Sequence, residues 1–156
     1  MDLHTLVLPV ILPAGPECRD PRSLAVDPDN LRLFVACGNM RMAVLNANSG
    51  DQVAYLPIGP GVDSIGYDPA RNLIYTANGG AQGSITIIRQ SVTDTYAVIQ
   101  NLPTRRRART LAVNSVTGEV YLVTDIRGVG VDQSGGIGTL RGAPIPGSFQ
   151  VLVIGN

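Results

Sequence analysis

The sequence contains no tryptophan and no lysine, and among its 156 residues it has only two phenylalanines, two cysteines and one histidine. The single histidine, His4, excludes a zinc site built on paired histidines and leaves no set of Ser, His and Asp to argue for. The motifs of serine hydrolases and of phosphate-binding loops are also absent. We therefore predict no catalytic residue, no metal site and no cofactor.

Net charge is the second quantity that the sequence lacks. Twelve basic residues, all of them arginine, balance twelve aspartates and glutamates, and the isoelectric point is about 6.5. A neutral chain has no general electrostatic attraction to nucleic acid or to anionic lipid, so we expect neither as a partner. The use of arginine alone meets a need for planar, two-pronged donors or reflects genome composition, and we favour the second.

Long hydrophobic runs are missing as well. The longest apolar run near the N-terminus, Leu6 to Leu12, is interrupted by Pro9 and is too short to cross a bilayer. It also lacks a basic flank, so we predict neither a signal peptide nor a membrane anchor. The expected location is the cytoplasm if Met1 is the true start, and the periplasm or the exterior if the chain is part of a longer exported protein.

Glycine and proline, in contrast, are abundant. The chain has 18 glycines and 11 prolines, 44% of its residues are hydrophobic and 15% are charged. This composition is typical of a globular protein built from many short strands and tight turns. We predict one all-β domain over residues 1–156.

Two short patterns each occur three times along the chain. The first is Ala25-Val26-Asp27-Pro28, then Gly66-Tyr67-Asp68-Pro69, then Ala112-Val113-Asn114-Ser115, at offsets of 41 and 46 residues. The second is Leu12-Pro13, then Leu56-Pro57, then Leu102-Pro103, at offsets of 44 and 46 residues. Periods of about 40 to 50 residues with four strands each are typical of β-propeller blades.

Each unit fits four strands, here called A to D from the central channel outward. Strands A are small and apolar because the channel is crowded, and strands B are rich in β-branched and aromatic residues. The predicted strands A are Leu24 to Val26, Ile65 to Tyr67 and Leu111 to Val113, and the strands B are Leu31 to Ala36, Leu73 to Ala77 and Val120 to Thr124. The predicted strands C are Met42 to Leu45, Ser84 to Ile88 and Phe149 to Ile154, and the strands D are Gln52 to Leu56 and Tyr96 to Leu102.

These strands add up to about three blades, or half of a propeller. Blades 18–58 and 61–102 are complete, whereas blade 109–156 lacks its outer strand and carries a long Gly-rich loop at 125–147. Residues 1–13 read as an orphan outer strand with no blade of its own.

A family resemblance rests on the order and spacing of several short sequence motifs. These motifs are Cys18, Leu24-Ala25-Val26-Asp27, Leu33-Phe34 before Cys37, Met42-Ala43-Val44, Leu56-Pro57-Ile58-Gly59, Gly61-Val62-Asp63, Asn78-Gly79, Ala108-Arg109-Thr110-Leu111-Ala112 and Pro146-Gly147-Ser148-Phe149. Over about residues 12–156 the chain resembles the YVTN-type β-propeller repeat proteins of bacteria, in particular the C-terminal half of a larger seven-bladed member. The resemblance implies an architecture rather than an activity.

Half a ring leaves apolar faces and strand edges uncovered. Propellers close with about four to eight blades, so two chains complete a six-bladed ring around a two-fold axis. We predict this homodimer, in which the orphan strand Thr5 to Leu12 supplies the missing strand D of the partner's last blade, beside Phe149 to Ile154. The alternative is a fragment of a longer gene product, whose N-terminal strand only completes a blade that was lost.

A binding site is expected where the loops from D to A and from B to C share one face, as in propellers generally. The predicted ligand-binding residues on this face are Arg22, Asp63, Asn78, Arg105, Arg106 and Arg109. Four arginines fall in the five positions from Arg105 to Arg109, and guanidinium forks match carboxylate or phosphate, which indicates an anion site. The alternative is a solvated loop in which Arg109 pairs with Asp63.

Cys18 and Cys37 lie 19 residues apart, on the same expected face of one blade. A disulfide between them would stabilise the fold by about 3 kcal/mol and would imply an oxidising compartment, and a reduced pair is the alternative. A metal site that recruits Met40 or Met42 beside the cysteines is less favoured, because Met42 is more simply explained by core packing.

The first functional hypothesis is a non-enzymatic binding scaffold that engages a protein or a small anionic ligand on the arginine-bearing face. One alternative is an enzyme of the lyase or hydrolase type, with a channel site assembled from Arg22, Asp63 and Arg109 where two half-rings meet. The other is a structural half-propeller without independent function.

Overall fold

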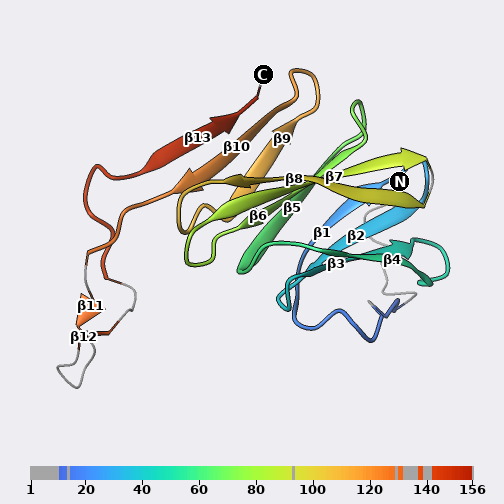
Figure 1. The fold of residues 1–156 in the computed structure, drawn as a ribbon, viewed down its shortest axis with the longest axis horizontal. Coiled ribbons are helices and arrows are strands. Elements are labelled where there is room, and N and C mark those ends of the chain that lie inside the picture. Colours follow the sequence, from blue (N-terminus) through green and yellow to red (C-terminus); the bar gives the residue numbers. More distant parts are fainter. Residues whose placement is uncertain are drawn as a thin grey trace, which may run out of the picture.

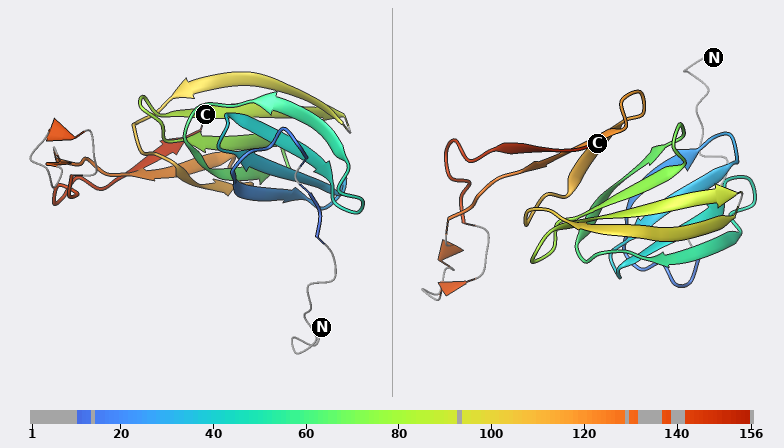
Figure 2. Two further views of the ribbon diagram at one scale, coloured as in Figure 1. Left: turned by 90° about the horizontal axis from the view of Figure 1, so that it is seen from below. Right: turned by 45° about the horizontal axis from the view of Figure 1, so that its top comes forward.

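The computed structural model of this protein describes residues 11–13, 15–92, 94–128, 130–131, 137–138 and 142–155. Regular structure in these ranges is β-strand throughout, and the strand pairings are antiparallel (Figures 1 and 2). The all-β class predicted from the sequence is confirmed. A search of the described residues finds no helix with the length and hydropathy of a membrane span.

The first sheet, blade 1, has the spatial strand order β1-β2-β3-β4. Its strands are β1 (Pro21–Asp27), β2 (Arg32–Cys37), β3 (Arg41–Asn46) and β4 (Gln52–Pro57). The hairpin between β3 and β4 closes because the side-chain oxygen of Asn46 accepts the N–H groups of Asn48 and Ser49, while Gly50 adopts a φ of 78° that suits glycine.

The second sheet, blade 2, repeats this order as β5-β6-β7-β8. Its strands are β5 (Val62–Asp68), β6 (Leu73–Asn78), β7 (Ser84–Val92) and β8 (Thr95–Pro103). The outer pair, β7 and β8, is longer than the outer pair of blade 1, so its hairpin extends beyond the rest of the sheet.

The third sheet, blade 3, has three strands in the order β13-β10-β9. They are β9 (Thr110–Asn114), β10 (Glu119–Thr124) and β13 (Gln150–Ile154), and a separate hairpin of β11 (Gly130–Val131) and β12 (Ile137–Gly138) lies within the Gly-rich segment. Within the described residues β13 is therefore an open edge. Residues 5–10 of the predicted outer strand Thr5 to Leu12 lie outside the described residues, so that prediction stays untested.

The turn from strand A to strand B has the same construction in all three blades. Asp27, Asp68 and Asn114 end their strands, and a side-chain oxygen of each accepts the backbone N–H groups two and three residues ahead at 3.0 to 3.3 Å. This Asx-type turn satisfies amides that no strand partner reaches. The recurring pattern found in the sequence therefore marks a structural turn.

Successive blades pack face to face, with blade 2 in the middle (Figure 2). Phe34 lies at the centre of the first interface, with its ring centroid 5.2 Å from that of Tyr67 and 6.1 Å from that of Tyr96. The buried residues between blades 1 and 2 are Phe34, Ala36, Met42, Val44, Leu56, Ile58, Val62, Ile65, Ile74 and Ile88. Those between blades 2 and 3 are Tyr75, Ala77, Ile85, Ile87, Ala108, Val120 and Leu122.

Each blade presents the same strand positions to the blade that follows it, and we call this its following face. The following face consists of Ala25, Phe34, Ala36, Met42 and Val44 in blade 1, of Gly66, Tyr75, Ala77, Ile85 and Ile87 in blade 2, and of Ala112, Tyr121, Val123, Val151 and Val153 in blade 3. The opposite side, the leading face, carries two strand A residues: Leu24 and Val26, Ile65 and Tyr67, or Leu111 and Val113. Side chains alternate across a strand, so this register decides which side chains meet at each interface.

Candidate binding face

The loops from D to A and from B to C lie at one edge of the sheets, here called the loop face. The register places them together, because β1 begins opposite the end of β2, and β3 begins opposite the end of β4. Blade 2 has the same arrangement. All six predicted ligand-binding residues belong to these loops or to the strand ends beside them: Arg22, Asp63, Asn78, Arg105, Arg106 and Arg109.

A residue with a left-handed backbone conformation precedes strand A in each of the three blades. Asp20, Gly61 and Arg107 adopt φ angles of 56°, 71° and 71°, in the left-handed region. Two residues later the pairing register shifts at Arg22 in blade 1 and at Asp63 in blade 2. A β-bulge of this kind takes one residue out of the ladder and re-aims its side chain. The bulges thus turn Arg22 and Asp63 along the loop face.

Arg22, Asp63 and Arg109 form a row of ion pairs that crosses all three blades. Nη1 of Arg22 lies 3.3 Å from Oδ1 of Asp63, and Nη1 of Arg109 lies 2.9 Å from Oδ2 of Asp63. The hydrogen bond with Asp20 and, to a smaller extent, the charge of Asp63 raise the pKa of Arg22. The ion pair between Arg109 and Asp63 is the contact predicted by the alternative to an anion site, in which the arginine loop is solvated. All three side chains are partly exposed, so water and salt screen their attraction.

A second repeated contact joins neighbouring strands A. Oγ of Ser23 accepts the N–H of Ile65, and Oγ of Ser64 accepts the N–H of Leu111, both at 3.3 Å. Thr110 has the equivalent position in blade 3, at the end of the row. The hydroxyl groups therefore fix how far β1, β5 and β9 slide relative to one another.

Asn78 is fully buried and has a structural role in the B to C loop. Its Nδ2 donates to Oγ of Ser84 at 3.3 Å and to Oγ1 of Thr86 at 3.0 Å, while Oγ1 of Thr76 donates to its Oδ1 at 3.1 Å. These bonds satisfy a polar side chain inside the sheet. The structure leaves no surface of Asn78 for a ligand.

The arginine loop is held rigidly by its backbone. The N–H of Ala108 donates to the carbonyl of Arg105 at 3.0 Å, and the carbonyl of Arg106 accepts a hydrogen bond from Oγ1 of Thr124 at 2.9 Å. The side chains of Arg105 and Arg106 are exposed and form no ion pair with a described residue. Among the described residues these two guanidinium groups therefore have no carboxylate partner.

Arg107 belongs to a separate cluster. Its Nε lies 3.2 Å from Oδ1 of Asp125, and Nε of Arg127 lies 3.0 Å from Oδ2 of the same carboxylate. This cluster joins the D to A loop of blade 2 to the B to C loop of blade 3.

Charges of opposite sign gather at the two edges of the sheets, although the chain as a whole is neutral. The loop face carries eight arginines and four carboxylates among the described residues: Arg19, Arg22, Arg41, Arg105, Arg106, Arg107, Arg109 and Arg127 with Glu17, Asp20, Asp63 and Asp125. The opposite edge carries three arginines and six carboxylates: Arg32, Arg71 and Arg89 with Asp27, Asp29, Asp51, Asp68, Asp94 and Glu119. The loop face is therefore positive and suits an anionic partner.

An apolar groove of about 500 Å³ runs between the end of blade 2 and the open edge of blade 3. It is lined by Leu102, Pro103, Thr104, Arg105, Leu152 and Ile154. Oγ1 of Thr104 is buried and has no hydrogen-bond partner among the described residues. The groove lies where the outer strand of a complete blade would run beside β13.

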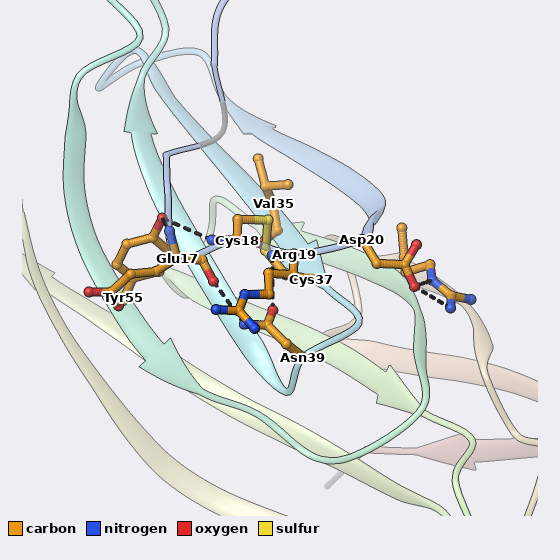
Figure 3. The surroundings of a disulfide bond; sticks show 9 residues. Glu17, Cys18, Arg19, Asp20, Val35, Cys37, Asn39 and Tyr55 are labelled. Carbon is orange, nitrogen blue, oxygen red and sulfur yellow. Dashed lines mark hydrogen bonds and ion pairs between the residues drawn. A yellow bond between two sulfur atoms is a disulfide. The ribbon is translucent and has the colours of Figure 1, made fainter.

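Cys18 and Cys37 are joined by a disulfide, with their Cα atoms 5.4 Å apart (Figure 3). The Tyr55 hydroxyl accepts the N–H groups of Glu17 and Cys18, each at 3.1 Å. Asn39 holds the same segment, because its Oδ1 accepts the N–H of Arg19 at 3.1 Å and its Nδ2 donates to the carbonyl of Glu17 at 2.8 Å. The loop that precedes β1 is thereby fastened to blade 1.

In the part of the chain that the structure describes, no three His, Cys, Asp or Glu side chains come together as metal ligands. Both cysteines are occupied by the disulfide, and Met42 is buried in the interface between blades 1 and 2. The contacts that sequence reasoning missed are Asp20 beside Arg22 and Asp125 between two arginines. The only signal for these contacts in the sequence is that each carboxylate lies a few positions from an arginine.

Comparisons with known proteins identify the fold. No family model and no curated protein matches the sequence. Among solved structures, this chain is similar to a hydrazine synthase from Kuenenia stuttgartiensis, with a TM-score of 0.58, 17% identity, and 67% of this chain and 30% of that chain covered. The arrangement of the described strands agrees with these similarities to solved structures. The fold is that of β-propeller blades.

Two further similar structures are a eukaryotic initiation factor and Sqt1 from Saccharomyces cerevisiae. The TM-scores are 0.53 and 0.56 and the identities are 15% and 13%. They cover 69% and 76% of this chain but only 27% and 34% of their own chains. This chain therefore spans about a third of the length of the solved structures that it matches.

Proposed function

We propose that this protein is a β-propeller binding scaffold whose ring is completed by a second copy of the chain. The proposal rests on a difference in solvent exposure between equivalent positions of the blades. The following face is buried in blades 1 and 2, but in blade 3 Val151 and Val153 are 51% and 56% exposed. Their equivalents in blade 2, Ile85 and Ile87, are covered by blade 3.

The other end of the chain shows the complementary mismatch. Leu24 and Val26 on the leading face of blade 1 are 58% and 53% exposed, whereas Ile65, the equivalent of Leu24 in blade 2, is 7% exposed and Tyr67, the equivalent of Val26, is partly buried. Apolar side chains in these positions are suited to burial against another blade. The strand A residues of this face are therefore open to a second copy, whereas Val35, Ala43 and Leu45 on its strands B and C are buried within the chain.

Two copies that join end to end in this way close a ring of six blades, within the range of known propellers. The assembly contains two such joints, each between blade 3 of one chain and blade 1 of the other. It therefore has two-fold symmetry and leaves no blade face open. The resemblance to YVTN-type repeat proteins supports propeller blades of this kind. We propose that the chain belongs with that family.

The loop face is the surface that such a ring would offer to a partner. Its excess of arginine favours a small anion or an acidic protein segment, as do Arg105 and Arg106, which form no ion pair with a described residue. The fold comparisons are compatible with a scaffold in general terms. The choice of an anionic partner rests on the charges of this face.

Sedimentation velocity over a range of concentrations tests the ring. We expect a dimer at micromolar concentration for the unchanged chain. Val153→Glu and Leu24→Glu should each raise the dissociation constant at least about 10-fold, because each puts a charge into both joints. Val116→Glu, at a turn position that is 88% exposed and outside the joints, is the control. A monomer at every concentration would overturn the proposal.

A further inference from the structure

Among the described residues β13 is an edge strand with an apolar groove beside it, whereas the equivalent strands β3 and β7 each pair with an outer strand (Figure 1). We infer that this edge and the groove form a strand-accepting site for an extended segment of a partner protein. In that segment, apolar side chains at alternate positions are followed by an acidic one. The inference rests on the proposed binding function, whose partner it specifies, but it does not need the ring, because the whole site lies within one chain.

Two apolar side chains of β13 are only partly buried on the side of the groove. These are Leu152 and Ile154, which belong to its lining. Their equivalents in blade 1, Ala43 and Leu45, are 0% and 2% exposed, although no described blade covers that face. In blade 1 the outer strand β4 runs beside them, and its Tyr55 packs against them. An outer strand beside β13 would complete the burial in the same way.

The direction of the incoming segment follows from blade 2. β8 runs antiparallel to β7 and ends at the loop face, where Pro103 pairs with Ser84. The equivalent of Ser84 in blade 3 is Gln150, the first residue of β13. A segment that pairs with β13 in the same way therefore has its C-terminal end beside Gln150, at the loop face. Such addition of a strand to a sheet edge is a common mode of peptide recognition.

The groove selects side chains at every second position of the segment. Residues opposite one another in antiparallel strands point to the same side of the sheet, so those opposite Ile154, Leu152 and Gln150 would face the groove. Leu102 and Pro103 of blade 2 lie across the groove from β13. The first two of these positions are therefore suited to apolar, β-branched side chains, which also favour the extended conformation.

The third groove-facing position is next to a cation. Arg105 lines the groove, is exposed and forms no ion pair with a described residue. Its loop adjoins the start of β13, because Oγ1 of Thr124, the partner of Gln150 in the sheet, donates to the carbonyl of Arg106 at 2.9 Å. The loop is also packed on blade 2, since a Cβ on Gly83 would overlap the carbonyl of Arg105. A carboxylate opposite Gln150 would thus find a guanidinium partner.

Fluorescence anisotropy with a labelled, capped peptide tests the inference. The probe is Ser-Val-Thr-Val-Thr-Glu-Ser, in which the two valines and the glutamate take the groove-facing positions. We expect saturable binding with a dissociation constant of about 1 to 100 µM. The matched control, Ser-Val-Thr-Glu-Thr-Val-Ser, has the same composition and charge but places the carboxylate opposite Leu152, and it should bind at least about 10-fold more weakly.

Backbone methylation of the probe shows whether a strand is added. Two versions of equal mass carry N-methyl groups either on both valines or on both threonines. Alternate N–H groups of a strand point to the same neighbour, so one version should bind at least about 10-fold more weakly than the parent peptide and the other nearly as well. Equal binding of the two versions would overturn the strand pairing.

Charge reversal locates the acidic end of the segment. Arg105→Glu should weaken binding of the probe at least about 10-fold, and a probe with lysine in place of glutamate should recover it, which also shows that the variant is folded. Val116→Glu adds a negative charge at a turn that is 88% exposed and outside the groove, and it should change neither affinity. Loss of binding in Val116→Glu as large as in Arg105→Glu would overturn the assignment of the site.

Sedimentation of the same samples separates this inference from the ring. A protein that forms a dimer but does not bind the probe would overturn the strand-accepting site and leave the ring standing. A monomer that binds the probe would overturn the ring and support the site.

Discussion

The backbone of Gly66 in blade 2 lies directly against the side chain of Val113 in blade 3. A Cβ at position 66 would stand 2.6 Å from Cγ2 of Val113 and 2.8 Å from Cδ1 of Leu111. Carbon atoms that are not bonded to one another prefer about 3.5 to 4.0 Å. The absence of a side chain at Gly66 is therefore what allows β5 and β9 to approach at the inner edge of the blades.

Gly66→Ala is expected to destabilise the protein by about 1 to 3 kcal/mol, because the added methyl group overfills the interface between blades 2 and 3. The measurement is urea unfolding followed by far-UV circular dichroism. Gly128→Ala, where the nearest atom to a new Cβ is 4.0 Å away, is the control. The second change Val113→Ala should recover part of the loss, since the two positions are in contact. Simple additivity of the two changes would contradict the packing argument.

Replacement of both cysteines, Cys18→Ala with Cys37→Ala, is expected to lower the free energy of unfolding by about 3 kcal/mol, because the unfolded chain gains freedom without the cross-link. The unchanged protein should lose a similar amount when dithiothreitol is added. The double variant should not respond to the reductant. Equal stability of the unchanged protein with and without reductant would show that the two cysteines are not bonded.

The tyrosines beside Phe34 predict a loss of stability in alkali. Burial first, and then the nearby carboxylates Asp27 and Asp94 respectively, raise the pKa of Tyr67 and of Tyr96 to about 12. A tyrosine in the unfolded chain ionises near pH 10. Their contribution is thus complete below pH 10 and is lost as the pH rises from 10 to 12, because the unfolded state releases its protons first.

Urea unfolding at pH 9 and pH 11 checks this expectation. The protein with Tyr67→Phe and Tyr96→Phe should lose less stability between these two values than the unchanged protein. An identical loss in both proteins would place the alkaline sensitivity elsewhere.

Asp68→Ala is expected to cost about 1 to 3 kcal/mol, because it removes the buried carboxylate that accepts the N–H groups of Ala70 and Arg71. Asp68→Asn should cost less, since Asn114 performs the same role in blade 3. Thermal and urea unfolding of the two variants give the comparison. An asparagine variant as unstable as the alanine variant would assign the effect to the ion pair with Arg71 instead.

The repeats made the blades predictable because a turn such as Asp27-Pro28 and an edge residue such as Pro57 mark fixed places in a four-stranded sheet. The predicted strand Gln52 to Leu56 differs from the observed Gln52–Pro57 by one residue. The bulges at Arg22 and Asp63 were not predictable, since one extra residue hardly alters the alternation of apolar and polar side chains. They nevertheless decide how these two charges are aimed.

Burial was the other quantity that the sequence did not reveal. Asn78 ends β6 and Arg105 follows β8, and both are polar, yet Asn78 is enclosed by hydroxyl groups and Arg105 is exposed. The difference depends on Thr76 and Thr86, which lie on neighbouring positions of the sheet. Such a set is assembled only when the strands have paired.

The disulfide fastens one end of the row of blades, while blade 3 is supported by blade 2 alone among the described residues. Amide hydrogens of β10 and β13 should therefore exchange with solvent sooner than those of β2 and β3, as fluctuations open the row from its C-terminal side. Closure of the ring would give blade 3 a neighbour on both sides. The rate of exchange in β13 would then report directly, and without any mutation, whether the ring is closed in solution.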